Sequence, residues 1–133
     1  FFGAEKTFKN HHVKNTNQLY SFLRSLDYTN GILLTPLNRE NIRLNAKVPI
    51  FIDWKSHPYL GNEVIEWRER ISLVRAFYSL DATEKDRMQS FKKINSKQIT
   101  SFILTDNSYP IKNCIPIYKD EENIVYSVKN CFK

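Results

Sequence analysis

The feature that most constrains the fold is a pair of short apolar runs, Ile32–Thr35 and Val48–Trp54. Both are rich in branched or aromatic residues, and Pro36 closes the first. Runs this short favour buried strands over helices. The segment between them, which we expect to form a short helix from Asn38 to Ala46, is long enough for a crossover between parallel strands. The sequence therefore predicts a β–α–β unit.

Apolar side chains recur at intervals of three and four in two further segments, which indicates amphipathic helices. The first begins at Thr16, a suitable N-cap, and stops before Asn30 and Gly31. The second is the longest, with its apolar stripe at Val64, Trp67, Ile71, Val74 and Tyr78. Its charged residues, Glu66, Arg68, Glu69, Arg70 and Arg75, are expected to form a solvated face with an i,i+4 pair between Glu66 and Arg70. A capping box at Thr83 and Asp86 predicts a third helix that continues to about Ile94.

Three more runs have the character of strands, namely Ile99–Leu104, Ile115–Lys119 and Ile124–Val128. The last two flank a polar segment and predict a hairpin. Because strands alternate with helices, we predict an α/β fold with a mixed, mainly parallel central sheet of about five strands, flanking helices and a C-terminal β-hairpin. The chain of 133 residues suits a single α/β domain over residues 16–133, after a lead-in segment at residues 1–15.

Cys114 and Cys131 are the only cysteines of the chain, and they flank the predicted hairpin. If its turn centres on Glu122 and Asn123, the two cysteines face each other across the strands. They then form a disulfide, which would stabilise the fold by about 3 kcal/mol and indicate a compartment outside the cytosol. Alternatively, they are two free thiols near the chain end, because a one-residue shift would turn them to opposite faces. Two cysteines without a CxxC spacing supply too few ligands for zinc, so no metal site is predicted.

Polar residues follow each of the three strands that we expect to be parallel. The carboxyl ends of parallel strands gather at one edge of a sheet, where ligands bind in open α/β folds. Asp106 follows the third strand, close to that edge. The predicted ligand-binding residues are Thr35, Arg43, Asp53, Lys55 and His57. Such a set suits a phosphate or a sugar. In the alternative interpretation, the polar residues after the strands cap the next helices and Lys55 pairs with Asp53.

The chain carries a formal net charge of +6, but its basic residues are scattered and are mostly lysine. A nucleic-acid interface would show a basic stripe with arginines or aromatics, so nucleic acid is not an expected partner. A surface beside anionic lipid headgroups fits the charge equally well. The sequence contains no GxSxG, P-loop, GxGxxG or HExxH motif, which excludes the common hydrolase, nucleotide-binding and zinc-protease classes. We predict no cofactor.

The segment GILLTPLNRENIRLNAKVPIFIDWKSHPY, followed by EVIEWRERI, resembles the soluble C-terminal domain of certain bacterial polytopic membrane proteins, of a glycosyltransferase-like or uncharacterised family. The matching residues are Thr35, Pro36, Arg43, Asp53, Trp54, Lys55, Pro58, Trp67 and Arg70. The runs FILTDN and IPIYKDEENIVYSVK resemble the strand and hairpin that close such domains. The resemblance implies a domain joined to the membrane region of the same polypeptide, on the extracytoplasmic (periplasmic) face, with the main catalytic groups in the membrane part.

We therefore expect a non-catalytic accessory or ligand-recognition domain of a bacterial integral membrane protein, with a glycan or a phosphate-bearing molecule as its ligand. Two alternatives stay open. One is a small enzyme that uses Asp53 and His57 as acid and base, although the sequence shows no nucleophile or metal set to accompany them. The other is a basic nucleic-acid-binding module, whose binding would weaken steeply with added salt.

Overall fold

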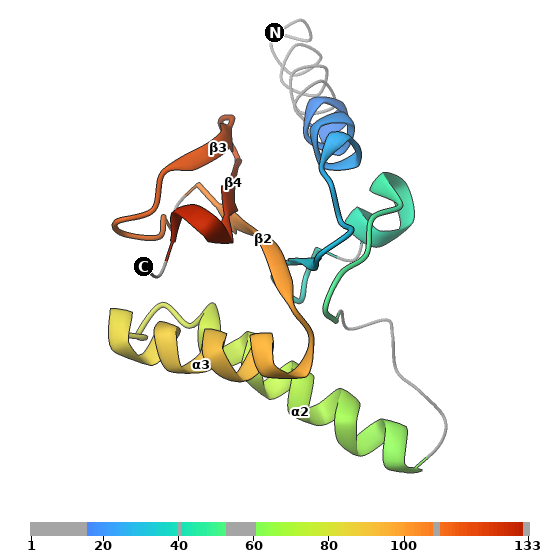
Figure 1. Ribbon diagram of the computed structural model, residues 1–133, viewed down its shortest axis with the longest axis vertical. Helices are drawn as coiled ribbons and strands as arrows, with labels where there is room; N and C mark the ends of the chain where they lie inside the picture. The colour runs from blue at the N-terminus through green and yellow to red at the C-terminus, as the bar shows by residue number, and fades with distance from the viewer. Residues whose placement is uncertain (1–15, 40, 53–60, 108–109, 132–133) are drawn as a thin grey trace, which may run out of the picture.

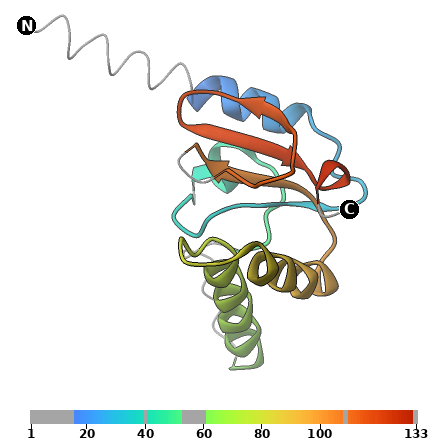
Figure 2. The ribbon, with the colours of Figure 1, turned by 90° about the vertical axis from the view of Figure 1, so that its left-hand side faces the viewer.

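The computed structural model of the chain describes residues 16–39, 41–52, 61–107 and 110–131. In this part of the chain, helices cover both faces of a four-stranded sheet (Figures 1 and 2). The N-terminal helix, described over residues 16–25, and the short π-helix η1 (Ile42–Ala46) lie on one face. Helices α2 (Gly61–Phe77) and α3 (Glu84–Lys97) lie on the other. The α/β class is confirmed.

The sheet has the strand order β1–β2–β4–β3 and mixed strand directions. β1 (Ile32–Leu34) pairs parallel with β2 (Thr100–Asp106). β4 (Asn123–Ser127) pairs antiparallel with both β2 and β3 (Pro116–Lys119). The prediction of a mainly parallel sheet of five strands is therefore wrong, since the described residues form four strands with mostly antiparallel pairing.

The second predicted strand is reduced to one parallel bridge between Ile50 and Leu33. The amide of Leu33 donates to the carbonyl of Pro49 at 2.9 Å, and the amide of Phe51 donates to the carbonyl of Leu33 at 3.2 Å. The ladder cannot lengthen along β1, because β1 is only three residues long and is followed closely by Pro36, which has no N–H to donate. The end of the predicted strand falls at residues 53–54, outside the described residues.

Neighbouring residues of the central strands point into two separate cores. On β2, Ile103 packs on the α2–α3 side and Leu104 on the side of the N-terminal helix, and both are fully buried. Ile124 and Val125 repeat this arrangement on β4. The α2–α3 core also contains Ile32, Leu34, Phe51, Val74, Phe77, Phe91, Ile94 and Tyr126. The opposite core contains Leu19, Leu23, Leu33, Ile42, Ala46 and Val48.

The helix boundaries confirm one predicted cap and correct two others. Thr83 Oγ1 accepts a hydrogen bond from the Asp86 amide at 3.1 Å, and Asp86 Oδ2 accepts one from the Thr83 amide at 3.2 Å, so the predicted capping box opens α3. Thr16 is already helical and is not an N-cap. Asn38 does not cap η1, which begins at Ile42 after Asn41 and has no side-chain cap.

The terminal hairpin is confirmed, but its predicted register is wrong. Its turn centres on Glu121 and Glu122, one residue earlier than predicted, and Tyr118 pairs with Val125. The Asp120 carboxylate accepts hydrogen bonds from the amides of Glu122 and Asn123, both at 2.7 Å. This side chain holds a turn in which neither glutamate adopts a positive φ.

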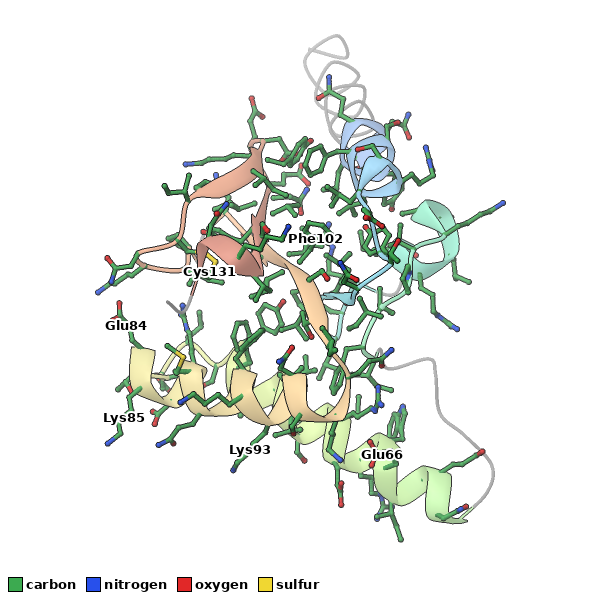
Figure 3. All side chains as sticks on the ribbon, in the orientation of Figure 1. Glu66, Glu84, Lys85, Lys93, Phe102 and Cys131 are labelled. Atoms are coloured by element: carbon green, nitrogen blue, oxygen red, sulfur yellow. A yellow bond between two sulfur atoms is a disulfide. The ribbon has the colours of Figure 1, made fainter. Side chains whose placement is uncertain are left out.

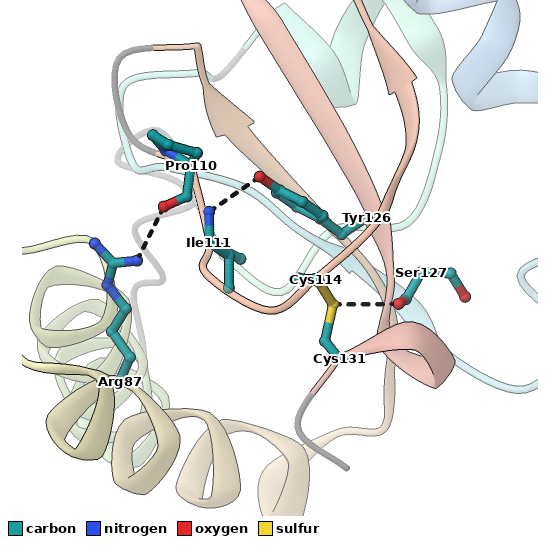
Figure 4. Close-up of a disulfide and its surroundings, with 7 residues drawn as sticks. All are labelled: Arg87, Pro110, Ile111, Cys114, Tyr126, Ser127 and Cys131. Atoms are coloured by element: carbon teal, nitrogen blue, oxygen red, sulfur yellow. Dashed lines mark hydrogen bonds between the residues drawn. A yellow bond between two sulfur atoms is a disulfide. The ribbon is translucent and has the colours of Figure 1, made fainter.

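Cys114 and Cys131 form a disulfide, with their Cα atoms 4.8 Å apart (Figure 4). Neither cysteine lies in a strand, so the bridge does not arise from the cross-strand pairing that the sequence suggested. The short 3-10 helix η2 (Val128–Asn130) instead turns the chain after β4 so that Cys131 meets Cys114. Nearby, the amide of Ile111 donates to the buried hydroxyl of Tyr126 at 3.0 Å. The loop before β3 is thus fastened at two points.

Gly31 approaches the start of β2 so closely that a side chain has no room. A Cβ at Gly31 would lie 2.8 Å from the carbonyl oxygen of Ile99 and 2.9 Å from the amide nitrogen of Ser101, both backbone atoms. We expect Gly31→Ala to lower the free energy of unfolding by about 1–3 kcal/mol. Gly61→Ala is the control, because nothing lies within 4 Å of its added Cβ at the start of α2. Urea denaturation measures both, and equal stability of the two variants would contradict the close approach.

The disulfide closes a loop between residues 17 apart in sequence. Restricting a loop of this size in the unfolded chain stabilises a fold by about 3 kcal/mol. We expect Cys114→Ala/Cys131→Ala to unfold at a lower urea concentration than the oxidised parent and at nearly the same concentration as the reduced parent. Denaturation with and without dithiothreitol tests this expectation, which fails if the reductant leaves the midpoint of the parent unchanged.

Candidate functional site

The structure places two of the five predicted ligand-binding residues. Thr35 follows β1 and is 1% exposed, and Arg43 is exposed on η1. Thr35 Oγ1 is buried without a hydrogen-bond partner, so no such bond joins it to Arg43. Asp53, Lys55 and His57 lie outside the described residues, and their roles stay predictions.

The ends of β1 and β2 do meet at one edge of the sheet, as predicted. These strands are parallel neighbours, with Leu34 opposite Ile103, and β2 continues beyond this pair to Asp106. Asp106 is exposed and pairs with Asn123 at the beginning of β4. Three adjacent strands therefore present their ends at this edge, which we call the carboxyl edge of the sheet.

Tyr78 closes the seam between β1 and β2 at the carboxyl edge. Its hydroxyl donates a hydrogen bond to the carbonyl oxygen of Leu104 at 2.6 Å and lies 3.2 Å from that of Leu34. The ring packs edge-on against Phe77, with the centroids 4.9 Å apart. Because Tyr78 directly follows α2, this contact fixes the end of the helix beside the loop that follows β1.

A cavity of 430 Å³ lies between that loop and the last turn of α2. It is lined by Pro36, Leu37, Asn38, Val74, Arg75, Tyr78 and Ser79. The Arg75 guanidinium offers paired N–H donors of the kind that bind a phosphate or a carboxylate. The Asn38 amide and the Ser79 hydroxyl are groups of the kind that pair with sugar hydroxyls, and the Ser79 hydroxyl accepts a hydrogen bond from the Asp81 amide at 3.3 Å. The cavity therefore combines one cation with neutral polar groups on a partly apolar wall.

Three polar side chains, Thr35 among them, are buried at the carboxyl edge without a hydrogen-bond partner. They are Thr35 Oγ1, Thr105 Oγ1 and Asn123 Oδ1, on residues that are at most 2% exposed. They belong to three neighbouring strands. Thr35 directly follows β1, Thr105 is the second-last residue of β2, and Asn123 is the first residue of β4. An unpaired buried polar group costs about 1–3 kcal/mol. Such a cost at one edge of a sheet is typical of a functional site.

Sequence reasoning missed the residues of this cavity. Arg75 was assigned to the solvated face of its helix, and Asn38 was assigned to a helix cap. The available signal for Arg75 was its position in the last turn of a helix whose final aromatic residue reaches the strand ends. That signal requires knowing where the helix packs, which the pattern of apolar residues alone does not give.

The described segments contain no group of three histidine, cysteine, aspartate or glutamate side chains that could hold a metal ion. None of their helices is both long enough and apolar enough to cross a membrane.

Comparison with known proteins adds one match. Residues 14–74 match a family described as a domain of unknown function, DUF6798. The matched segment contains the described N-terminal helix, β1, η1 and most of α2, and it stops directly before Arg75. No curated protein and no solved structure matches the chain.

Proposed function

We propose that this chain is a non-catalytic ligand-recognition domain of a bacterial integral membrane protein, on the extracytoplasmic side of the membrane. Its ligand is a phosphorylated sugar, which binds in the cavity at the carboxyl edge. The observation that carries this proposal is the placement of the Arg75 guanidinium beside the polar side chains of Asn38 and Ser79 in one cavity. Its volume of 430 Å³ falls within the range of about 300–1,000 Å³ typical of small-molecule sites.

The chemistry of the cavity supports binding and not acid–base catalysis. Among the described residues, those lining the cavity include no carboxylate, imidazole or thiol that could act as a general base. The alternative of an enzyme that uses Asp53 and His57 depends on residues outside the described segments.

Two observations support the extracytoplasmic assignment. The Cys114–Cys131 disulfide is of a kind that persists in oxidising compartments. The resemblance of residues 31–59 and 63–71 to soluble domains of polytopic membrane proteins supports the attachment to a membrane region. The assignment is thus independent of the cavity, and each part of the proposal can fail separately.

Isothermal titration calorimetry with glucose 6-phosphate, glucose and inorganic phosphate tests the cavity. We expect the sugar phosphate to bind more tightly than either of the other probes, because it engages the guanidinium and the neutral groups together. Arg75→Gln should weaken its binding by about tenfold or more, since a hydrogen bond to a charged group contributes about 1.5–3 kcal/mol.

Lys92→Gln is the matched control, because it removes one positive charge from an exposed position on α3 that does not line the cavity. It should leave the affinity unchanged. Failure of the parent to bind any of the three probes, or equal weakening by the two variants, would contradict the proposed site.

A further inference from the structure

A groove of 680 Å³ runs between α2 and α3 on their outer side. Its lining residues are Ile65, Arg68, Glu69, Ser72, Leu73, Lys93, Ser96 and Lys97. The fully buried core residues of these helices, such as Val74 and Ile94, are different ones, whereas Leu73 packs against that core and also lines the groove. In Figure 3, Lys93 points away from the sheet. The groove shares no lining residue with the cavity at the carboxyl edge.

Ile65 gives the groove an apolar surface that the fold leaves uncovered. Its side chain is 63% exposed in the first half of α2, and Leu73 lies half-buried further along the same helix. Removing apolar surface from water is favourable in proportion to the area covered. A hydrocarbon chain in the groove would therefore be stabilised by contact with both side chains.

The acidic side chains near the groove, Glu66 and Glu69, form salt bridges with Lys97 and Arg70. Lys97 Nζ lies 2.8 Å from Glu69 Oε2 and 3.0 Å from Glu66 Oε2, and Arg70 Nε lies 3.0 Å from Glu66 Oε1. The Lys97 ammonium, followed by the Arg70 guanidinium, holds the pKa of Glu66 below its usual value. Hydrogen bonds to Glu69 and Glu66 raise the pKa of Lys97. These four residues form a network that is neutral at pH 7.

Arg68 and Lys93 are not part of this network. Neither side chain forms an ion pair or a hydrogen bond within the described segments. They approach the groove from different helices, Arg68 from α2 and Lys93 from α3. The groove thus carries two positive side chains without ion-pair partners beside an exposed aliphatic surface, and the Ser72 hydroxyl also lines it. The Ser96 hydroxyl already donates to the carbonyl of Lys93 at 2.7 Å.

We propose that this groove binds one anionic phospholipid molecule at a membrane surface. Arg68 and Lys93 hold the phosphate, and the acyl chain lies on Ile65 and Leu73. A single-stranded nucleic acid typically stacks its bases on aromatic side chains, and the described residues that line the groove include none. A purely polar anion would leave Ile65 uncovered. The combination of two unpaired cations with aliphatic surface fits a lipid better than either.

Co-sedimentation with vesicles tests this proposal. The 133-residue chain should bind vesicles of phosphatidylglycerol and phosphatidylcholine, and it should bind vesicles of phosphatidylcholine alone at least tenfold more weakly. Arg68→Gln/Lys93→Gln should lower binding to the anionic vesicles by about tenfold or more. Ile65→Ser should lower it as well, because the acyl chain loses its contact.

The controls distinguish binding of lipid in the groove from general attraction of a basic protein to a negatively charged vesicle. Lys85→Gln/Lys92→Gln removes the same charge from exposed positions of α3 outside the groove, and Leu80→Ser removes an aliphatic side chain that is 81% exposed elsewhere. Both should retain the binding of the parent. Equal loss in the control and groove variants, or no binding of the parent to anionic vesicles, would overturn the proposal.

The vesicle test of the groove and the calorimetric test of the cavity at the carboxyl edge can fail separately. Arg68→Gln/Lys93→Gln should leave calorimetric binding of glucose 6-phosphate unchanged, and Arg75→Gln should leave vesicle binding unchanged. Loss of both activities in the Arg68→Gln/Lys93→Gln variant would contradict two separate sites. An unaltered urea midpoint of each variant shows that its fold is intact.

Discussion

The two central strands must bury side chains on both faces of the sheet at once, and the remaining structure depends on this constraint. Ile103 and Leu104 are adjacent on β2, yet each is completely buried in a different core. One helical layer could cover only one of them. The chain therefore supplies the α2–α3 pair for one face and the N-terminal helix with η1 for the other (Figure 2). Gly31 belongs to the same constraint, because it lets β1 enter the sheet beside the start of β2.

Covering the sheet in this way positions both proposed sites. The end of α2 reaches the seam between β1 and β2, where the Tyr78 hydroxyl bonds to the strand carbonyls, and the cavity opens beside this contact. The opposite sides of α2 and α3 have no sheet to cover, and there Ile65 stays exposed beside Arg68 and Lys93. One helix thus contributes an arginine to each site from different turns, Arg68 to the groove and Arg75 to the cavity.

Local signals in the sequence predicted local structure well. The capping box at Thr83, the presence of helix α2 and the terminal hairpin all depend on residues close together in the chain. Features set by distant contacts were not predictable in this way. The run at Ile50 has the composition of a strand, but the short β1 limits its described pairing to one bridge. The disulfide depends on the turn made by η2, and the register of the hairpin depends on the Asp120 carboxylate, neither of which an apolar pattern reveals. The meeting of the ends of β1 and β2 at one edge was predictable from the sequence, whereas the position of Arg75 beside the loop after β1 was not.

Chemical-shift mapping in a nitrogen–proton correlation spectrum tests the central claim most directly, namely that the carboxyl edge is where a polar ligand binds. On addition of glucose 6-phosphate, the amides of Leu37, Asn38, Arg75 and Ser79 should shift together and saturate with one affinity. The amides of Ile65 and Ser96, in the groove between the helices, should stay in place. Saturating shifts confined to residues away from the carboxyl edge, or a spectrum that does not change, would contradict the account.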